Sequence, residues 1–213
     1  MTSGLIGVAL FSLGMVLTPG PNMIYLVSRS IAQGSRAGMI SLTGVALGFT
    51  VYLTATCLGL TAIFAYVPVA YTALKLAGAA YLLWMAWNAV RPGGTSPFQP
   101  RELAPESSRR LFGMGLFTCL LNPKIAIIYL SVLPQFIDPS LGHVLLQSLA
   151  LGSVQVLIGT AVNAAIALSA GSLAAFLARK PVWLAVQRYL TGTILGIFAI
   201  RMATDRTRAL VAS

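Results

Sequence analysis

Long apolar runs are the feature that most limits what this chain can fold into. The residue types AVILMFWYC make up 57% of its 213 residues, and charged residues make up only 8%. A bilayer core of about 30 Å requires a helix of about 20 mainly apolar residues, and several runs approach or exceed that length. Lipid offers no partner for backbone polar groups, so each run must satisfy its own as a helix. The composition therefore predicts an all-α membrane protein.

Six apolar runs predict six transmembrane helices. The fifth run is long enough to tilt or to project beyond the membrane, and the sixth is the shortest because Arg188 precedes it. Lys75 and Arg188, near the starts of the third and sixth runs, are expected to be interfacial anchors. The expected spans are residues 4–28, 37–64, 71–90, 111–136, 142–177 and 189–203.

The first run contains an interruption that a plain helix cannot accommodate. The segment TPGPNM occupies residues 18–23, inside apolar sequence that extends from Leu5 to Val27. Pro19 and Pro21 remove backbone donors and block continuation of the helix, and Gly20 is a permissive joint. The groups freed by the break need partners from protein, ligand or trapped water, because lipid supplies none. We therefore expect a functional site at this break.

A second break relates the two halves of the chain. Asn122-Pro123-Lys124 interrupts the fourth run, and a constant offset of 104 residues aligns this region with the first break. Pro19, Tyr25 and Gly48 then match Pro123, Tyr129 and Gly152. Because each half has three spans, an odd number, the halves are expected to insert with opposite orientation, as two inverted-topology repeats. The two breaks should then face each other near the midplane.

This pattern predicts three parts. Residues 1–90 form the first three-helix repeat, residues 91–110 a polar cytoplasmic connecting loop, and residues 111–213 the second three-helix repeat. Helices 1 and 4 of the six are the ones broken at proline motifs.

The net charge of +10 is best explained by membrane orientation. The basic residues gather in the loops after spans one, three and five, and positive loops stay inside, which puts both termini outside. Arg201, Arg206 and Arg208 near the C-terminus argue the other way, and a five-span arrangement would return that terminus to the cytoplasm. A nucleic-acid partner is not expected, because the sequence has no basic face or aromatic platform.

The cysteines and the histidine predict no metal or redox chemistry. Cys57 and Cys119 lie far apart in apolar runs and are expected to be buried packing thiols, and His143 has no companion ligands. The alternative is a thiol-redox relay membrane protein of similar three-plus-three architecture, which uses paired cysteines on equivalent spans. Here the position equivalent to Cys119 is Met15. No cofactor motif or catalytic triad is present, so an enzyme is not expected.

Four motifs in order along the chain resemble a known family. They are TPGPNM at 18–23, LKLAGAAYL at 74–82, LNPK at 121–124 and LPQFID at 133–138. The chain is thereby similar to the LysE/RhtB amino-acid efflux family. The resemblance implies an inner-membrane secondary transporter that exports amino acids by using the proton gradient. Because members of this family differ in substrate, the resemblance does not identify the cargo.

The two breaks suggest how a zwitterionic amino acid would be held. The half-helix after Pro21 presents free amides and the positive end of its dipole, which suit a carboxylate. Carbonyls freed before each proline could accept from an ammonium group, and Lys124 is either a second carboxylate anchor or a structural cation. The rival interpretation is that both breaks are only hinges. The expected substrate-binding residues are Pro19, Gly20, Pro21, Asn22, Met23, Asn122, Pro123, Lys124, Gln155 and Asn163.

Gln155 and Asn163 enter that set because they lie on a face of small residues in the fifth span, where tight packing is an equal alternative. No acidic residue lies within a clean apolar core, which favours neutral cargo such as homoserine, threonine or small aliphatic amino acids over lysine or arginine. Asp138 is the candidate for proton coupling, with helix capping as the alternative. Tyr25 and Tyr129 are either gates or ordinary core aromatics. The expected partners are the amino acid and the lipid bilayer, and a homodimer is left open.

Overall fold

The structure is a computed structural model that describes residues 2–18, 20–66, 68–91, 103–179 and 181–204. These residues are mostly helical and include no strand. The α-helices are α1 (Thr2–Leu17), α2 (Pro21–Gln33), α3 (Ser35–Tyr66), α4 (Pro68–Val90), α5 (Ser108–Leu120), α6 (Pro123–Ile127), α7 (Val144–Arg179) and α8 (Pro181–Thr204). A π-helix, η1 (Ile128–Val132), and two short 3-10 helices, η2 (Leu133–Phe136) and η3 (Pro139–Leu141), lie between α6 and α7.

Two helices, α3 and α7, are each long and apolar enough to cross a bilayer. Two further crossings arise if each bent pair counts as one span: Gly4–Leu17 with Pro21–Gln33, bent by 53°, and Ser108–Leu120 with Pro123–Phe136, bent by 50°. Both bends lie where the sequence predicts a broken helix. The chain is thus a helical membrane protein with two to four candidate spans among its described residues.

The helix boundaries differ from the expected spans mainly at the ends. The helix expected over 189–203 is α8, which already begins at Pro181 and continues through position 188. Proline at the first helical position costs nothing, because its missing N–H would have no partner in the helix. The helix expected from residue 111 begins at Ser108, where the Ser107 side chain accepts a hydrogen bond from the Arg110 amide and caps it.

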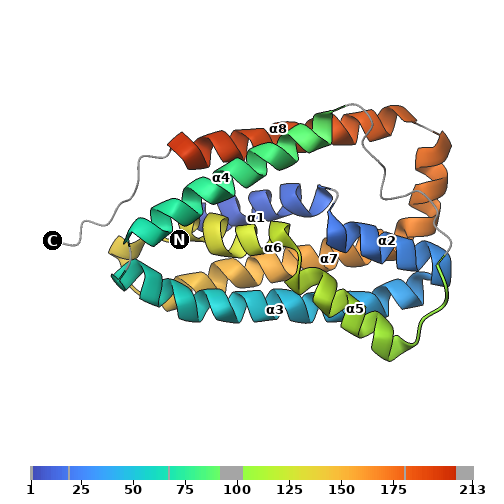
Figure 1. Cartoon of the computed structure of the whole chain (residues 1–213), viewed down its shortest axis with the longest axis horizontal. Coiled ribbons are helices and arrows are strands. Elements are labelled where there is room, and N and C mark those ends of the chain that lie inside the picture. The colour runs from blue at the N-terminus through green and yellow to red at the C-terminus, as the bar shows by residue number, and fades with distance from the viewer. Residues whose placement is uncertain (1, 19, 67, 92–102, 180, 205–213) are drawn as a thin grey trace.

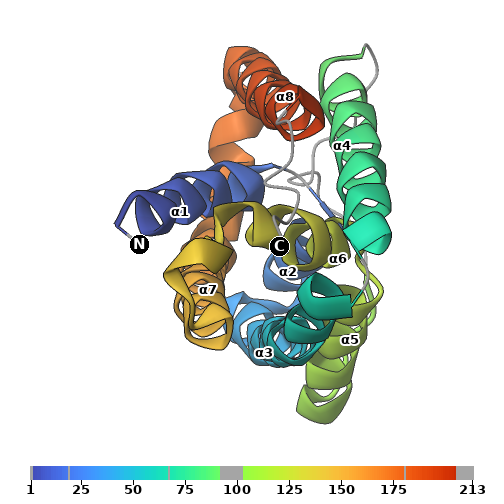
Figure 2. The same cartoon turned by 90° about the vertical axis from the view of Figure 1, so that its left-hand side faces the viewer.

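The helices form a bundle in which α4 and α8 lie together along one side (Figure 1). The end-on view in Figure 2 shows α3, α5 and α7 on the opposite side, with α2 and α6 between the two groups. The main contacts pair α3 with α5, α3 with α7, and α1 with α7. Both breaks therefore lie in the interior of the bundle.

Small residues allow α3 and α5 to approach closely. A Cβ atom added at Gly44 of α3 would collide with the carbonyl oxygen of Phe112, and one added at Gly115 of α5 would collide with that of Ser41. A Cβ at Gly48 would come within 2.6 Å of the Cys119 Cβ. Helices in membranes associate through such small-residue contacts, because no hydrophobic force distinguishes the partner helix from lipid. Gly44 and Gly48 therefore bring the backbones of α3 and α5 close together.

The outer surface has the apolar character that lipid requires. Large apolar side chains are exposed on almost every helix, among them Leu58 at 71% and Leu157 at 68%. Trp84, Trp87 and Tyr189 are also exposed on α4 and α8. In a water-soluble monomer, an apolar surface of this extent would promote association.

Candidate functional site

The first break lies between α1 and α2. Thr18 folds back on α1, because its Oγ1 donates to the Gly14 carbonyl oxygen at 2.9 Å. Gly20 is the residue before α2 and provides no side-chain cap, while Pro21 occupies the first helical position. The first amides of α2 thus lack a side-chain partner from the residue that normally provides one.

The second break, between α5 and α6, is capped by its own side chain. Asn122 Oδ1 accepts a hydrogen bond from the Lys124 amide at 3.0 Å, and Pro123 occupies the first position of α6. The helix then widens into the π-helix Ile128–Val132, a form that occurs frequently at functional sites. The sequence gives no indication of this π-helix.

The two breaks are joined by hydrogen bonds across the halves of the chain. Asn122 Nδ2 donates to Asn22 Oδ1 at 3.0 Å, and the Lys124 ammonium group donates to the Thr18 carbonyl oxygen at 2.6 Å. A Cβ atom at Gly20 would lie 3.2 Å from Lys124 Cδ and 3.3 Å from Nζ. The absence of a side chain at Gly20 therefore leaves the space that Lys124 fills. The expectation that the breaks face each other is confirmed.

A small cavity of about 20 Å³ lies at this junction. It has room for about one water molecule. Its polar lining comes from both breaks and from α7, and its apolar lining from α1, α2, α3 and the segment after the second break. The polar lining residues are Thr18, Asn22, Asn122, Lys124, Gln155 and Asn163, and the rest are Met15, Val16, Gly20, Met23, Phe49, Ile125, Ile128 and Gly159.

Several lining groups are buried and lack a hydrogen-bond partner among the described residues. They include Gln155 Oε1 and Asn163 Oδ1, both acceptors, and Asn22 Nδ2, a donor whose amide lies near the weakly accepting Cys119 sulfur. Leaving a buried polar group unpaired costs about 1–3 kcal/mol, so such groups are uncommon in folded proteins. Three of them lie around one cavity, so it has unpaired groups that can hydrogen-bond to a polar guest or to water.

The comparison with known families gives a match over most of the chain. Residues 13–206 match the family described as LysE type translocator. The chain belongs to the LysE type translocator family.

Relatives of this LysE type translocator are named as efflux proteins. The chain is 33% identical over 162 residues to the "Homoserine/homoserine lactone efflux protein" of Salmonella typhimurium, and the matched region covers 76% of this chain and 77% of that protein. It is 32% identical over 136 residues to the "Leucine efflux protein" of Enterobacter sp. (strain 638), covering 59% and 60%. No solved structure matches the chain. The resemblance inferred from the four motifs is thereby confirmed.

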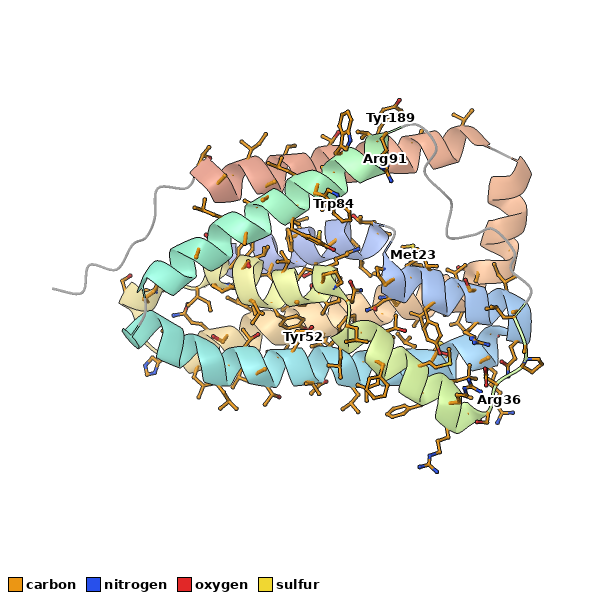
Figure 3. All side chains as sticks on the ribbon, in the orientation of Figure 1. Met23, Arg36, Tyr52, Trp84, Arg91 and Tyr189 are labelled. Atoms are coloured by element: carbon orange, nitrogen blue, oxygen red, sulfur yellow. The ribbon has the colours of Figure 1, made fainter. Side chains whose placement is uncertain are left out.

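Seven of the ten expected substrate-binding residues line the cavity. Gly20, Asn22, Met23, Asn122 and Lys124 line it, and Figure 3 shows Met23 where α1 gives way to α2. Gln155 and Asn163 also line it, from α7. Pro21 and Pro123 are exposed and are absent from the lining, and Pro19 lies outside the described residues.

The two repeat-related tyrosines have different surroundings. The Tyr25 hydroxyl donates to the Leu111 carbonyl oxygen at 2.8 Å and lies 3.1 Å from Ser41 Oγ, so it ties α2 to α5 and α3. Tyr129 is fully buried in the π-helix and stacks on Tyr52 with ring centroids 5.8 Å apart. Its hydroxyl has no hydrogen-bond partner in the described part of the chain. Neither tyrosine lines the cavity.

Asp138 lies beyond the end of the second broken segment and not at the cavity. Its Oδ1 accepts from the Ser140 amide at 3.1 Å and from Ser140 Oγ at 2.6 Å, which caps the short helix Pro139–Leu141. The capping alternative therefore describes its geometry.

The sequence-based prediction missed a set of hydrogen bonds that joins α2 to the segment before α5. Gln33 Nε2 donates to the Glu106 carbonyl oxygen at 2.7 Å, and the Glu106 amide donates to Gln33 Oε1 at 3.0 Å. Arg29, also on α2, donates to the Ala104 carbonyl oxygen at 3.0 Å. The signal was the spacing of Arg29 and Gln33, four residues apart and hence on one face of the helix.

The cysteines do not form a redox pair. Cys57 and Cys119 are both free and buried, and they lie on two different helices, α3 and α5. This placement and the family match both favour a transporter over a thiol relay.

Proposed function

We propose that this chain exports neutral amino acids across the inner (cytoplasmic) membrane, in exchange for protons, through a site at the junction of its two broken helices. Its role is transport and not catalysis. The observation that carries the proposal is the direct hydrogen bonding of the two breaks around a cavity with unpaired polar groups. Secondary transporters commonly bind cargo where broken helices of two repeats meet.

Neutral cargo is favoured by the charges at the cavity. Lys124 is the one ionisable group in its polar lining, and no carboxylate lines it among the described residues. A cationic side chain would meet this lysine without a compensating acid, at a depth where an unpaired charge is costly. The named relatives act on homoserine, its lactone and leucine, all of which lack a charged side chain.

The same proposal includes six spans arranged as two inverted repeats, which residues 91–107 connect. Helices α4 and α8 have 23 and 24 residues, or about 35 Å at 1.5 Å per residue, which suffices for a core of about 30 Å. The pairs α3 with α7 and α4 with α8 are equivalent elements of the two halves that pack on each other. Gly20 and Lys124, which the offset equates, are also in contact.

We further propose that both termini lie outside. Support comes from the first turn of α1 and the last turn of α8, which lie toward the same end of the bundle, as an even number of spans requires (Figure 1). Arg36 and Arg91 lie toward the other end (Figure 3). That end would face the cytoplasm by the positive-inside rule.

Transport through this site requires a change of shape. A cavity of about 20 Å³ holds one water molecule and excludes an amino acid. The helices must therefore separate on one side to admit cargo and on the other to release it, as in alternating access.

Reconstituted vesicles test the activity itself. The purified protein is placed in proteoliposomes, and the exchange of labelled homoserine, threonine, leucine, lysine and glutamate is measured with and without an imposed pH gradient. We expect the neutral amino acids to move, and to move faster when protons can flow in the opposite direction. A protein that moves none of them, or that moves lysine best, would contradict the proposal.

The site is tested by Asn22→Ala and Pro21→Ala in cells loaded with the transported amino acid. We expect lower efflux from each variant at an equal amount of membrane-inserted protein. Unchanged efflux in both would remove the two breaks from the transport site.

Proton coupling through Asp138 is tested by Asp138→Asn. Asparagine is as good a helix cap as aspartate, so the variant keeps the local fold while removing the titratable group. We expect the pH gradient to lose its effect on the transport rate. Glu106→Gln, on the segment before α5, is the matched control and should keep the effect.

A further inference from the structure

Helix α7 presents two unpaired acceptors to the cavity. Gln155 and Asn163 are each only 3% exposed, and both line the cavity from one face of α7, with Gly159 between them. The residues at i, i+4 and i+8 lie on the same side of a helix, which places all three toward the junction. Phe49 of α3 faces the notch at Gly159, where an added Cβ would lie 3.1 Å from its ring.

The orientation of the Asn163 amide is fixed by its own helix. Its Nδ2 donates to the Gly159 carbonyl oxygen at 2.7 Å. This bond assigns nitrogen and oxygen to the two ends of the amide, so Oδ1 is the end left unpaired. Gln155 Oε1 is unpaired as well, among the described residues. The α7 wall of the cavity thus offers oxygen acceptors and no charge.

The lining from the two breaks offers donors. Lys124 Nζ comes from the second break and is buried, and among the described residues its hydrogen bond goes to the Thr18 carbonyl oxygen. Lys124 forms no ion pair in the part of the chain that the structure describes. Asn22, from the first break, also lines the cavity, and its Nδ2 has no hydrogen-bond partner among the described residues. The cavity lining therefore combines a basic side chain from the second break with neutral oxygen acceptors from α7.

The two ends of an amino acid have complementary needs. A carboxylate only accepts hydrogen bonds, and an ammonium group only donates them, up to three at once. Two like charges a few ångströms apart repel strongly in a medium of low dielectric constant, so the ammonium group would avoid Lys124. A bond from an ammonium group to a carboxylate is stronger than one to a neutral carbonyl, so cargo would draw Lys124 away from Thr18.

We propose that Gln155 Oε1 and Asn163 Oδ1 receive the ammonium group of the cargo, while Lys124 takes its carboxylate. This assignment rests on the proposed function, because it specifies how the same site orients its cargo. In this assignment α7 recognises the amine. A compound that keeps only the ammonium group should depend on Gln155 and Asn163, and one that keeps only the carboxylate should depend on Lys124.

The experiment uses analogues that lack one group at a time. Exchange of labelled leucine in proteoliposomes is inhibited with leucine amide, which keeps the ammonium group, and with 2-hydroxy-4-methylpentanoate, which keeps the carboxylate. Homoserine, homoserine lactone and 2,4-dihydroxybutanoate form the matching set for a hydroxylated cargo. The pH is set so that the amines are protonated. The quantity compared is the ratio of the two inhibition constants in each variant.

We expect Gln155→Leu and Asn163→Leu to weaken inhibition by the amide or lactone about tenfold and to leave the hydroxy acid unchanged. Lys124→Met should do the reverse. Thr160→Val is the matched control, because Thr160 Oγ1 is another unpaired buried atom of α7 that lies outside the cavity. That variant should keep the wild-type ratio.

Adding a negative charge provides a second test if Gln155→Leu or Asn163→Leu folds poorly. Gln155→Glu places a carboxylate where the ammonium group would bind, so inhibition by the amide should strengthen relative to the wild type. A shifted ratio in either leucine variant or in Gln155→Glu supports the assignment.

Wild-type ratios in all three variants would overturn the assignment, as would equal weakening of both analogues. A wild-type protein that exchanges neither amino acid would instead overturn the proposed function itself. The two failures are therefore distinguishable in the same set of measurements.

Discussion

The break between α1 and α2 offers hydrogen-bond acceptors, whereas the break between α5 and α6 offers donors. Thr18 and Asn22 accept, through the carbonyl oxygen and Oδ1, and Lys124 and Asn122 donate to them. The second break also caps itself through Asn122, while the first has only Gly20 as the residue before its second helix. The comparison shows that the two breaks are complementary, because acceptors of the first are paired with donors of the second.

The largest expected effect comes from the donor that joins the two breaks. Lys124→Met keeps most of the side-chain volume but leaves the Thr18 carbonyl oxygen buried and unpaired. A hydrogen bond from a charged group contributes about 1.5–3 kcal/mol, so exchange of the cargo should fall about 10- to 100-fold. The measurement is the initial rate in proteoliposomes at equal protein content. A rate within twofold of the wild type would show that the donor side is dispensable.

The two asparagines should differ in their effect on stability. Asn122→Ala removes both a helix cap and a donor to Asn22, and should lower the free energy of unfolding by about 1–2 kcal/mol. Asn22→Ala removes one of these bonds and should cost about 1 kcal/mol or less. Thermal unfolding in detergent compares the two, and the double variant reports their coupling. Equal losses would mean that the cap at the second break contributes nothing.

Larger side chains at Gly20 test whether transport depends on the space that Lys124 fills beside the first break. A Cβ at this position would lie 3.2 Å from Lys124 Cδ, so Gly20→Ala should displace the lysine slightly and lower transport by a few-fold, with Gly20→Val lowering it further. The control is Gly113→Ala in α5, where an added Cβ meets nothing within 4 Å among the described atoms. Equal activity in all three variants would show that the contact with Lys124 has no functional role.

The smallest effect is expected at the repeat-related tyrosines. Tyr25→Phe removes a hydroxyl that bonds to Leu111, and should lower stability by about 1 kcal/mol. Tyr129→Phe removes a hydroxyl without a described partner, and should change stability by less than about 0.5 kcal/mol. If Tyr129→Phe nevertheless alters transport, its hydroxyl would bond to cargo or water during the cycle, as a gate would require.

Much of the fold follows from the sequence because apolar length and proline have few structural consequences in a membrane. The breaks at residues 18–21 and 122–124 and their mutual contact were predicted from three prolines and one offset. The full length of α8 was not predicted, because the expected span begins only after Arg188. A charged side chain lowers the mean hydropathy of the segment around it, but the helix can continue through that residue.

The details of the site were less accessible. The sequence left open whether Lys124 anchors cargo or only satisfies carbonyls, since that depends on the direction of one long side chain. The structure directs it to the Thr18 carbonyl oxygen and to the cavity at once. The π-helix around Tyr129 was not foreseen, because one extra residue per turn leaves no compositional trace. The roles of Asp138, Tyr25 and Tyr129 remain predictions.

The contact between Gly20 and Lys124 also bears on how such a molecule can evolve. The offset of 104 residues makes these two positions counterparts, and they touch. A pair of identical chains meeting in this way would carry the same residue on both sides, either two lysines that repel or two glycines that leave a void. Glycine facing lysine requires two partners whose sequences differ, and the two proposed repeats of one polypeptide meet that requirement without a second gene product.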